Sequence, residues 1–284
     1  MVYMAIPFPA IDPVAIGLGP VHVRWYGLAY LAGLVLGWLY MRRLLGSPAL
    51  WSNQQPPMKP AQADDFLLWA TLGTVIGGRL GFVLLYEPST FLHDPLRVFS
   101  VWEGGMAFHG GFLGVTLAII LFARVNRIPL LSLGDLAAAV VPFGLFFGRI
   151  ANFINGEVYG RITDVPWAVV FPAHVLDQGS GHIVGPRHPT QFYEAFLEGL
   201  VLFLVIRYFT HKREALKQPG LCAGVFLSGY ALARIFVEFF KEWDYGQFFT
   251  TEYFSTGMVY SIPMLIAGGI LIGYGTRKQV PTAA

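Results

Sequence analysis

The chain has 284 residues, of which 55% are hydrophobic and only 13% are charged, and its formal net charge is +2. Soluble domains carry about 25% charged residues, so this composition indicates an integral membrane protein surrounded by a lipid bilayer. The small net charge says little about partners, and we expect no nucleic-acid partner. The single cysteine, Cys222, excludes a disulfide framework and a cysteine-rich metal site.

Seven apolar segments approach the ~20 residues that a helix needs to cross a bilayer. They cover residues 25–41, 66–86, 107–123, 132–152, 192–209, 221–240 and 257–275. The sequence therefore predicts an all-α polytopic membrane protein with about seven transmembrane helices. We expect residues 1–284 to form a single integral membrane domain.

Lysine and arginine are unevenly divided between the two sides of the predicted spans. Of the 19 basic residues, eleven lie in one set of loops, five lie in the alternate set, and three lie within spans. The positive-inside rule then predicts that the N-terminus is outside and the C-terminus is cytoplasmic. The longest outer loop, 153–191, is predicted to form a small periplasmic head, in which residues 167–171 have a strand-like pattern.

The most unusual stretch is 144–160, where the apolar end of a predicted helix turns polar among several glycines. If the helix continues through Gly156, then Arg149, Asn152 and Gly156 share one face. An arginine near hydrocarbon depth costs at least ~2.5 kcal/mol, so it normally faces a protein interior or a wet cavity. Its planar fork of donors suits a phosphate. The stretch predicts an anion site, and an arginine that snorkels to the interface is the structural alternative.

Other polar residues of the spans are candidates for the same site. Tyr230, Arg234 and Glu238 are four residues apart and line one helical face, although an internal Arg–Glu pair would also explain them. His109 lies among glycines at an outer helix start, and its usual pKa of about 6.5 suits proton transfer. A lone interfacial histidine is nevertheless more often structural. Tyr26 lies at the outer boundary of the first span, where an aromatic anchor is the usual explanation.

Two further features favour structural roles. Arg79 lies between glycines in the second span, and we expect it to pair with a carboxylate such as Asp135 or Glu238. A proton or cation pathway would favour chains of Asp and Glu, of which the spans are nearly free. Glycines four residues apart in the second and third spans, at 73–81 and 110–114, predict close helix packing. We expect no metal and no cofactor, because metal-ligand and nucleotide motifs are missing from the sequence.

Four motifs together resemble one known family. They are the runs 148–160 (GRIANFINGEVYG), 109–111 (HGG), 187–191 (RHPTQ) and 230–239 (YALARIFVEF). In this order they are similar to the bacterial phosphatidylglycerol–prolipoprotein diacylglyceryl transferases. The long first run is highly specific, whereas HGG alone is weak.

The resemblance implies a multi-pass enzyme of the bacterial cytoplasmic (inner) membrane whose active site faces the periplasm. Such an enzyme moves the diacylglyceryl group of phosphatidylglycerol onto the lipobox cysteine thiol of a prolipoprotein signal peptide, which forms a thioether and releases glycerol 1-phosphate. The implied catalytic residues are His109, Arg149, Arg234 and Tyr26, and the implied substrate-binding residues are Arg149, Asn152, Glu157, Gly160, Tyr230 and Glu238. From the residues alone, a phospholipid or anion transporter that uses the same arginines is the alternative.

Overall fold

A computed structural model describes residues 5–9, 11–19, 21–100, 105–172, 185–242, 251 and 253–277. In these ranges, six helices are long and apolar enough to cross a membrane, and they confirm the predicted all-α polytopic fold. They are α1 (Trp25–Leu45), α2 (Gln62–Leu85), α4 (Phe108–Val125), α5 (Leu130–Ile154), α9 (Leu221–Glu238) and α10 (Thr256–Arg277).

The remaining predicted span, 192–209, is helical but irregular. It consists of α7 (Thr190–Glu194), the π-helical η5 (Ala195–Val201) and α8 (Leu202–Lys212), which follow one another without a break. Two fully buried glutamates, Glu194 and Glu198, interrupt its apolar character. π-Helical turns are rare and frequently occur at functional sites, so this segment differs from the six regular spans.

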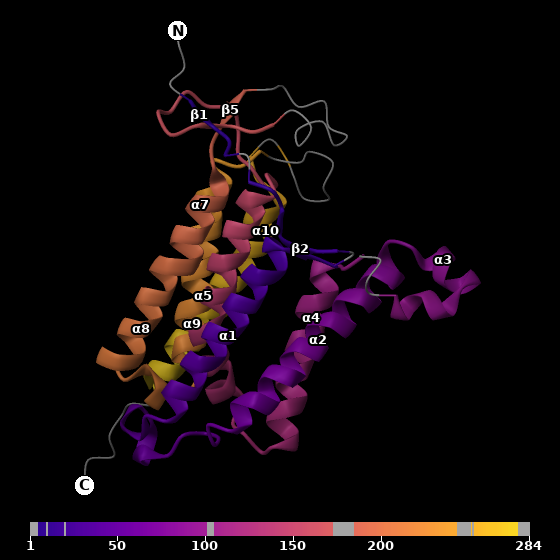
Figure 1. Ribbon diagram of the computed structural model, residues 1–284. Coiled ribbons are helices and arrows are strands. Elements are labelled where there is room, and N and C mark those ends of the chain that lie inside the picture. Colours follow the sequence, from indigo (N-terminus) through magenta and orange to yellow (C-terminus); the bar gives the residue numbers. More distant parts are fainter. Residues whose placement is uncertain are drawn as a thin grey trace.

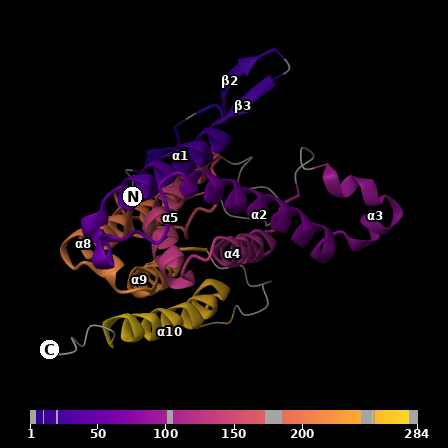
Figure 2. The same cartoon turned by 90° about the horizontal axis from the view of Figure 1, so that it is seen from below.

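Helices α1, α5, α7, α8, α9 and α10 form a bundle, and the pair α2 and α4 leans away from it (Figures 1 and 2). The predicted glycine contacts join this pair: a Cβ placed on Gly81 would lie 2.7 Å from the Cα of Gly110, and one placed on Gly77 would lie 2.7 Å from the Cα of Gly114. Larger side chains could not occupy these positions without separating the helices. The small residues thus determine how closely α2 and α4 approach.

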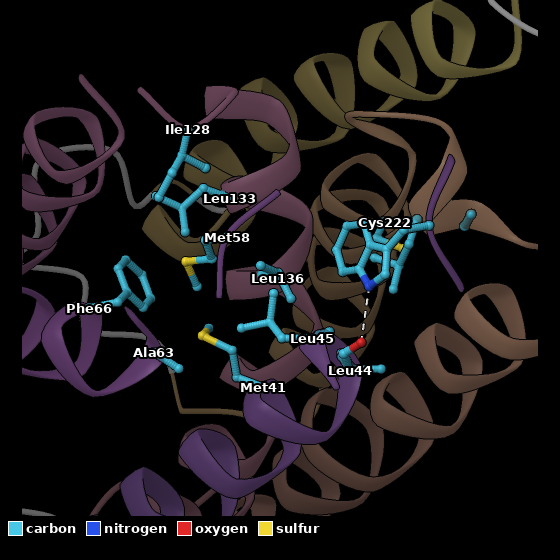
Figure 3. Packing of buried hydrophobic residues seen from close by; sticks show 14 of the residues in the cluster. Met41, Leu44, Leu45, Met58, Ala63, Phe66, Ile128, Leu133, Leu136 and Cys222 are labelled. Atoms are coloured by element: carbon cyan, nitrogen blue, oxygen red, sulfur yellow. Dashed lines mark hydrogen bonds between the residues drawn. The ribbon is translucent and has the colours of Figure 1, made fainter. Parts of the chain in front are cut away.

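The largest buried apolar cluster lies towards the end of the bundle opposite the strands β1 (Ile6–Pro7) and β5 (Pro186–Arg187). Figure 3 shows residues of α1, of the loop after it, and of α2, α5 and α9 that meet there. Trp51 donates its indole N–H to the carbonyl of Leu44 at 3.0 Å, which ties the loop to α1. Cys222 is fully buried in this cluster, as expected of a small apolar side chain.

A small sheet lies at the other end of the bundle (Figure 1). In it β4 (Val169–Val170) pairs in parallel with β1 (Ile6–Pro7) and antiparallel with β5 (Pro186–Arg187). The predicted strand 167–171 is therefore confirmed in position but is shorter than expected. The hairpin of β2 (Val14–Leu18) and β3 (Val21–Arg24) leads directly into α1.

Short helical turns make up the other connections. They are α3 (Pro88–His93) and η3 (Pro95–Phe99) after α2, η1 (Pro48–Leu50) and η2 (Ser52–Gln54) after α1, and η6 (Ala215–Lys217) before α9. Because successive long helices alternate in direction, the starts of α1, α4, α7 and α10 lie at the same end as the ends of α5 and α9 (Figure 1). The predicted site residues belong to these helix ends.

Candidate active site

Two arginines from different helices meet at one buried carboxylate. Arg149 lies near the end of α5 and Arg234 lies near the end of α9. The Nε of Arg149 is 3.2 Å from Oε2 of Glu194, and Nη1 of Arg234 pairs with Oε1 of the same carboxylate. Lys241, three residues after α9, brings its Nζ to 3.2 Å from this Oε1. One glutamate at the end of α7 thus gathers three cations.

The accessibility of these groups differs. The side chains of Arg149 and Arg234 are 20% and 19% exposed, whereas that of Glu194 is completely buried. The two arginine side chains are therefore partly accessible, whereas the carboxylate that joins them is not. Arginine forks suit an anion because they present several fixed N–H donors.

Two more carboxyl groups complete what we call the charged cluster, which contains Arg149, Arg234, Lys241, Glu194, Glu198 and Glu238. Oε1 of Glu238 is 2.6 Å from Nη2 of Arg234, so the predicted internal pair on α9 is confirmed. Oε2 of Glu198 is 3.5 Å from Nη2 of Arg149. The predicted neighbour Tyr230 interacts electrostatically with both arginines from the same face of α9.

Arg149 is oriented by the polar residues that follow it. Its Nη1 donates to Oδ1 of Asn152 at 3.4 Å, and the amide of Asn152 donates to Oε1 of Glu157 at 2.8 Å. The helix does not continue through Gly156, so the shared face that this condition would give does not extend so far: α5 ends at Ile154 and Gly156 adopts a φ of +72°. A residue with a Cβ would be disfavoured in this conformation. The turn brings Glu157 back towards Asn152.

Gly160 has a different role from the arginines. Its N–H donates to the carbonyl of His188 at 2.9 Å, and it forms a strand-like bridge with Lys241. A Cβ on this glycine would lie 2.7 Å from Thr190 and 2.8 Å from His188. Gly160 therefore allows the loop after α5 to pass close to the start of α7, and it positions the backbone of Lys241. Burial lowers the pKa of this lysine, which Glu194 opposes.

The two remaining predicted residues lie at the edge of the site. Tyr26 is hydrogen-bonded to Tyr30 at 3.2 Å between their hydroxyls, and it interacts electrostatically with Arg149 and Glu157. His109 is exposed in the first turn of α4, with its ring 5.9 Å from that of Tyr260 in α10.

The start of α10 connects His109 with the arginines. A Cβ on Gly257, three residues before Tyr260, would lie 3.3 Å from Nε of Arg234. The structure thus brings Arg149, Asn152, Glu157, Tyr230, Arg234 and Glu238 together, and it places Tyr26 and His109 around them.

Sequence reasoning missed three members of the cluster, Glu194, Glu198 and Lys241. The spacing of the two glutamates, four residues apart in an apolar segment, was an available signal, and the view that the spans are nearly free of carboxylates is wrong. Of the two carboxylates suggested as partners of Arg79, Asp135 is not one, and Glu238 pairs with Arg234. Asp135 accepts the backbone N–H groups of residues 220 and 223, and Arg79 donates to the carbonyls of residues 98 and 105.

Comparisons with known proteins agree with the motifs. Residues 13–274 match the family model described as prolipoprotein diacylglyceryl transferase. The phosphatidylglycerol–prolipoprotein diacylglyceryl transferase of Rhizobium meliloti (strain 1021) is 55% identical over 266 residues, which cover 93% of this chain and 91% of that protein. The protein of the same name from Brucella canis is 52% identical, with 93% and 92% covered. That of Phenylobacterium zucineum is 49% identical over 281 residues, with 98% and 97% covered.

Proposed function

The chain belongs to the prolipoprotein diacylglyceryl transferase family, and on this premise we propose that Arg149 and Arg234 hold the phosphate of phosphatidylglycerol during transfer. Family membership makes the protein a transferase of the bacterial inner membrane, with phosphatidylglycerol and prolipoproteins as substrates. We propose that the group that accepts the diacylglyceryl moiety is the thiol of the lipobox cysteine in the prolipoprotein signal peptide. No cofactor takes part in this proposal.

The observation that carries the proposal is the meeting of Arg149 and Arg234 at Glu194. Their guanidinium groups come from separate helices and are held by one buried carboxylate, and both side chains remain partly accessible. A lipid phosphate that reaches them would receive N–H donors from both arginines. Because the buried carboxylate and its neighbours hold the arginines before substrate arrives, little reorganisation is needed when charge develops.

The reaction suits such a site. The thiolate sulfur attacks the carbon of the diacylglyceryl unit that is joined through oxygen to the phosphate. A C–S bond forms there, and the C–O bond of the same carbon breaks, with its electrons passing to the phosphate oxygen. Glycerol 1-phosphate leaves, and its phosphate goes from one negative charge towards two. Donors directed at these oxygens therefore bind the transition state more strongly than the ground state.

The thiol proton requires an acceptor, because the thiolate is the nucleophile and a free thiol has a pKa of about 8.5. We assign this role to His109, which is exposed in the first turn of α4 and contacts α10 beside the cluster. Asn152 and Glu157 orient Arg149, and Glu238 and Tyr230 flank Arg234. Tyr26 borders the same space, and Gly160 positions the loop that carries Lys241.

We further infer that the site opens on the periplasmic side, with the N-terminus outside and the C-terminus cytoplasmic. The excess of lysine and arginine in the loops at the opposite end supports this orientation. In this arrangement residues 153–191 are a periplasmic head inserted in a single membrane domain of residues 1–284. The small sheet lies at the same end of the molecule as the C-terminal ends of α5 and α9, which supports this division (Figure 1).

The test uses membranes that contain the full chain, phosphatidylglycerol vesicles and a synthetic lipobox peptide, with the peptide analysed by mass spectrometry. We expect the wild type to form a diacylglyceryl adduct, and Arg149→Ala and Arg234→Ala each to lower the rate by about 10²–10³-fold, as loss of a transition-state donor does. The matched control is Arg42→Ala, because Arg42 forms a solvent-exposed pair with Asp64 at the opposite end; its rate should stay within about twofold.

His109→Gln separates a chemical role from a structural one. Its pH–rate profile should lose the acidic limb of the wild type, because glutamine does not titrate. Wild-type turnover in either arginine variant at equal membrane insertion would contradict the phosphate site. A wild-type profile in His109→Gln would remove only the assignment of the base.

A further inference from the structure

Glu198 is the one member of the charged cluster that lacks a close cation of its own. It is completely buried in η5, and neither of its carboxyl oxygens has a hydrogen-bond partner among the described residues. Its nearest cationic atom, Nη2 of Arg149, is 3.5 Å away, and the same arginine is closer to Glu194. Glu194, by contrast, meets three cations. Two carboxyl groups one turn apart thus have very different surroundings.

We propose that Glu198 is held as the neutral acid and thereby sets the charge of the cluster to one net positive charge, which matches the single negative charge of a lipid phosphodiester. This inference rests on the proposed function and names a charge-setting residue that does not touch substrate. Glu198 is completely buried, whereas the side chain of Arg149 is partly accessible. The lipid phosphate would contact the accessible part of Arg149.

The physical reason is that a buried carboxylate is unfavourable unless donors or cations compensate for its lost hydration. The groups that face Glu198 are Arg149 from α5, Tyr230 and Arg234 from α9, Lys241 after α9, and Glu194 on its own helical segment. The three cations are already bonded to Glu194. Because two neighbouring carboxylates repel each other, the proton stays on the one with fewer partners.

The protonation state of Glu198 matters for catalysis because it sets the net charge of the charged cluster. With Glu198 neutral, the three cations exceed the two ionised carboxylates, Glu194 and Glu238, by one. A bound phosphodiester then makes the charged cluster and its ligand neutral together, and the phosphate of the product adds one negative charge. If Glu198 were ionised, the empty cluster would be neutral and each anionic state would carry one more negative charge in a region of low dielectric constant. Ionisation of Glu198 should therefore weaken lipid binding.

The experiment compares Glu198→Gln with Glu194→Gln in the same membrane assay. Glutamine mimics a protonated glutamate in shape and charge, and the two positions are both fully buried. We expect Glu198→Gln to keep kcat/KM at pH 7 within about threefold of wild type and to extend activity to higher pH. Glu194→Gln should lose at least about a hundredfold, because removing one partner of a buried ion pair leaves uncompensated charges.

Two further measurements distinguish the source of any pH effect. The infrared carbonyl band of a protonated carboxylic acid should be present in the wild type and reduced in Glu198→Gln. In Lys241→Arg, whose guanidinium does not titrate, the alkaline limb of kcat/KM should remain. A limb that moves in Lys241→Arg and not in Glu198→Gln would assign the titration to the lysine and overturn the proposal.

Loss of at least about a hundredfold in Glu198→Gln, as in Glu194→Gln, would show that the ionised form is needed and would also overturn the proposal. If Glu198→Gln does not insert, Glu198→Met provides a second neutral side chain of similar length, and the same outcomes apply. The absence of an adduct with the wild type would instead contradict the proposed function. The two failures are thus separate.

Discussion

Asp135 offers the sharpest test of how the fold holds α9, the helix that carries Arg234, in place. Its carboxylate is completely buried in α5 and accepts the backbone N–H groups of Gly220 at 2.7 Å and Ala223 at 2.8 Å, at the start of α9. These N–H groups have no partner within their own helix. Gly220 precedes α9 with a φ of +96°, which turns the chain into the carboxylate. Asp135 therefore caps α9 from a neighbouring helix.

The substitution Asp135→Asn changes this cap with little change in volume. Asparagine keeps one accepting oxygen and presents an NH2 group to the other backbone N–H. One charge-assisted hydrogen bond, with a net contribution of about 1.5–3 kcal/mol, is lost, and the favourable interaction of a negative charge with the helix N-terminus is removed as well. We expect a total loss of about 2–4 kcal/mol, or roughly 5–10 °C in the unfolding temperature.

The assay is thermal unfolding of the purified full chain in detergent, followed by transferase activity per folded molecule. The matched control is Asp64→Asn, because Asp64 accepts from Trp38 and Arg42 at the surface and should lose less than about 1 kcal/mol. Activity per folded molecule of Asp135→Asn should stay within about threefold, because Arg234 lies about 20 Å along α9 from this cap. An unfolding temperature equal to that of the control would refute the cap, and loss of activity without loss of stability would show that Asp135 takes part in the reaction.

Two other predictions concern packing and pH. Gly114→Ala should lower the free energy of unfolding by about 1–3 kcal/mol in the same assay, because the added Cβ would lie 2.8 Å from the Cα of Gly77. The control is Gly134→Ala, which should be neutral or stabilising because a Cβ at this position would meet no atom within 4 Å. Burial lowers the pKa of His188 from 6.5. Between the lowered pKa and 6.5, the unfolded chain therefore binds a proton at this residue that the folded chain does not. The stabilisation is present above pH 6.5 and is lost as pH falls through the lowered pKa, and His188→Gln should flatten this decline in the unfolding temperature. Equal stability of the two glycine variants, or an unchanged acid decline in His188→Gln, would contradict these assignments.

Many features of the fold and the site could be predicted from local sequence. The apolar length of six spans is a property of composition, and the alignment of Tyr230, Arg234 and Glu238 follows from helical periodicity. The glycine spacing in α2 and α4 also predicted a real contact, because only small residues allow two backbones to approach so closely. Arg149 was found from its unusual depth in an apolar segment.

The end of α5 shows the limit of this reasoning. Helical periodicity would place Gly156 on the face of Arg149 only if the helix continued that far, but the chain turns after Ile154. The amide of Asn152 then reaches Glu157, and Gln191 of α7 donates to the Glu157 carbonyl at 2.7 Å. This last partner is distant in sequence, so no local pattern could show where the polar residues after the helix would point.

By itself the sequence determined that the chain enters the membrane, which segments cross it, and which arginines are too deep to be ordinary surface residues. Only the tertiary structure decided what neutralises those arginines. Glu194 and Glu198 lie in an apolar helical segment where a carboxylate is unfavourable, and they become tolerable only where α5 and α9 supply cations. Hydrophobic length and periodicity depend on neighbours along the chain, whereas the compensation of a buried charge depends on neighbours in space.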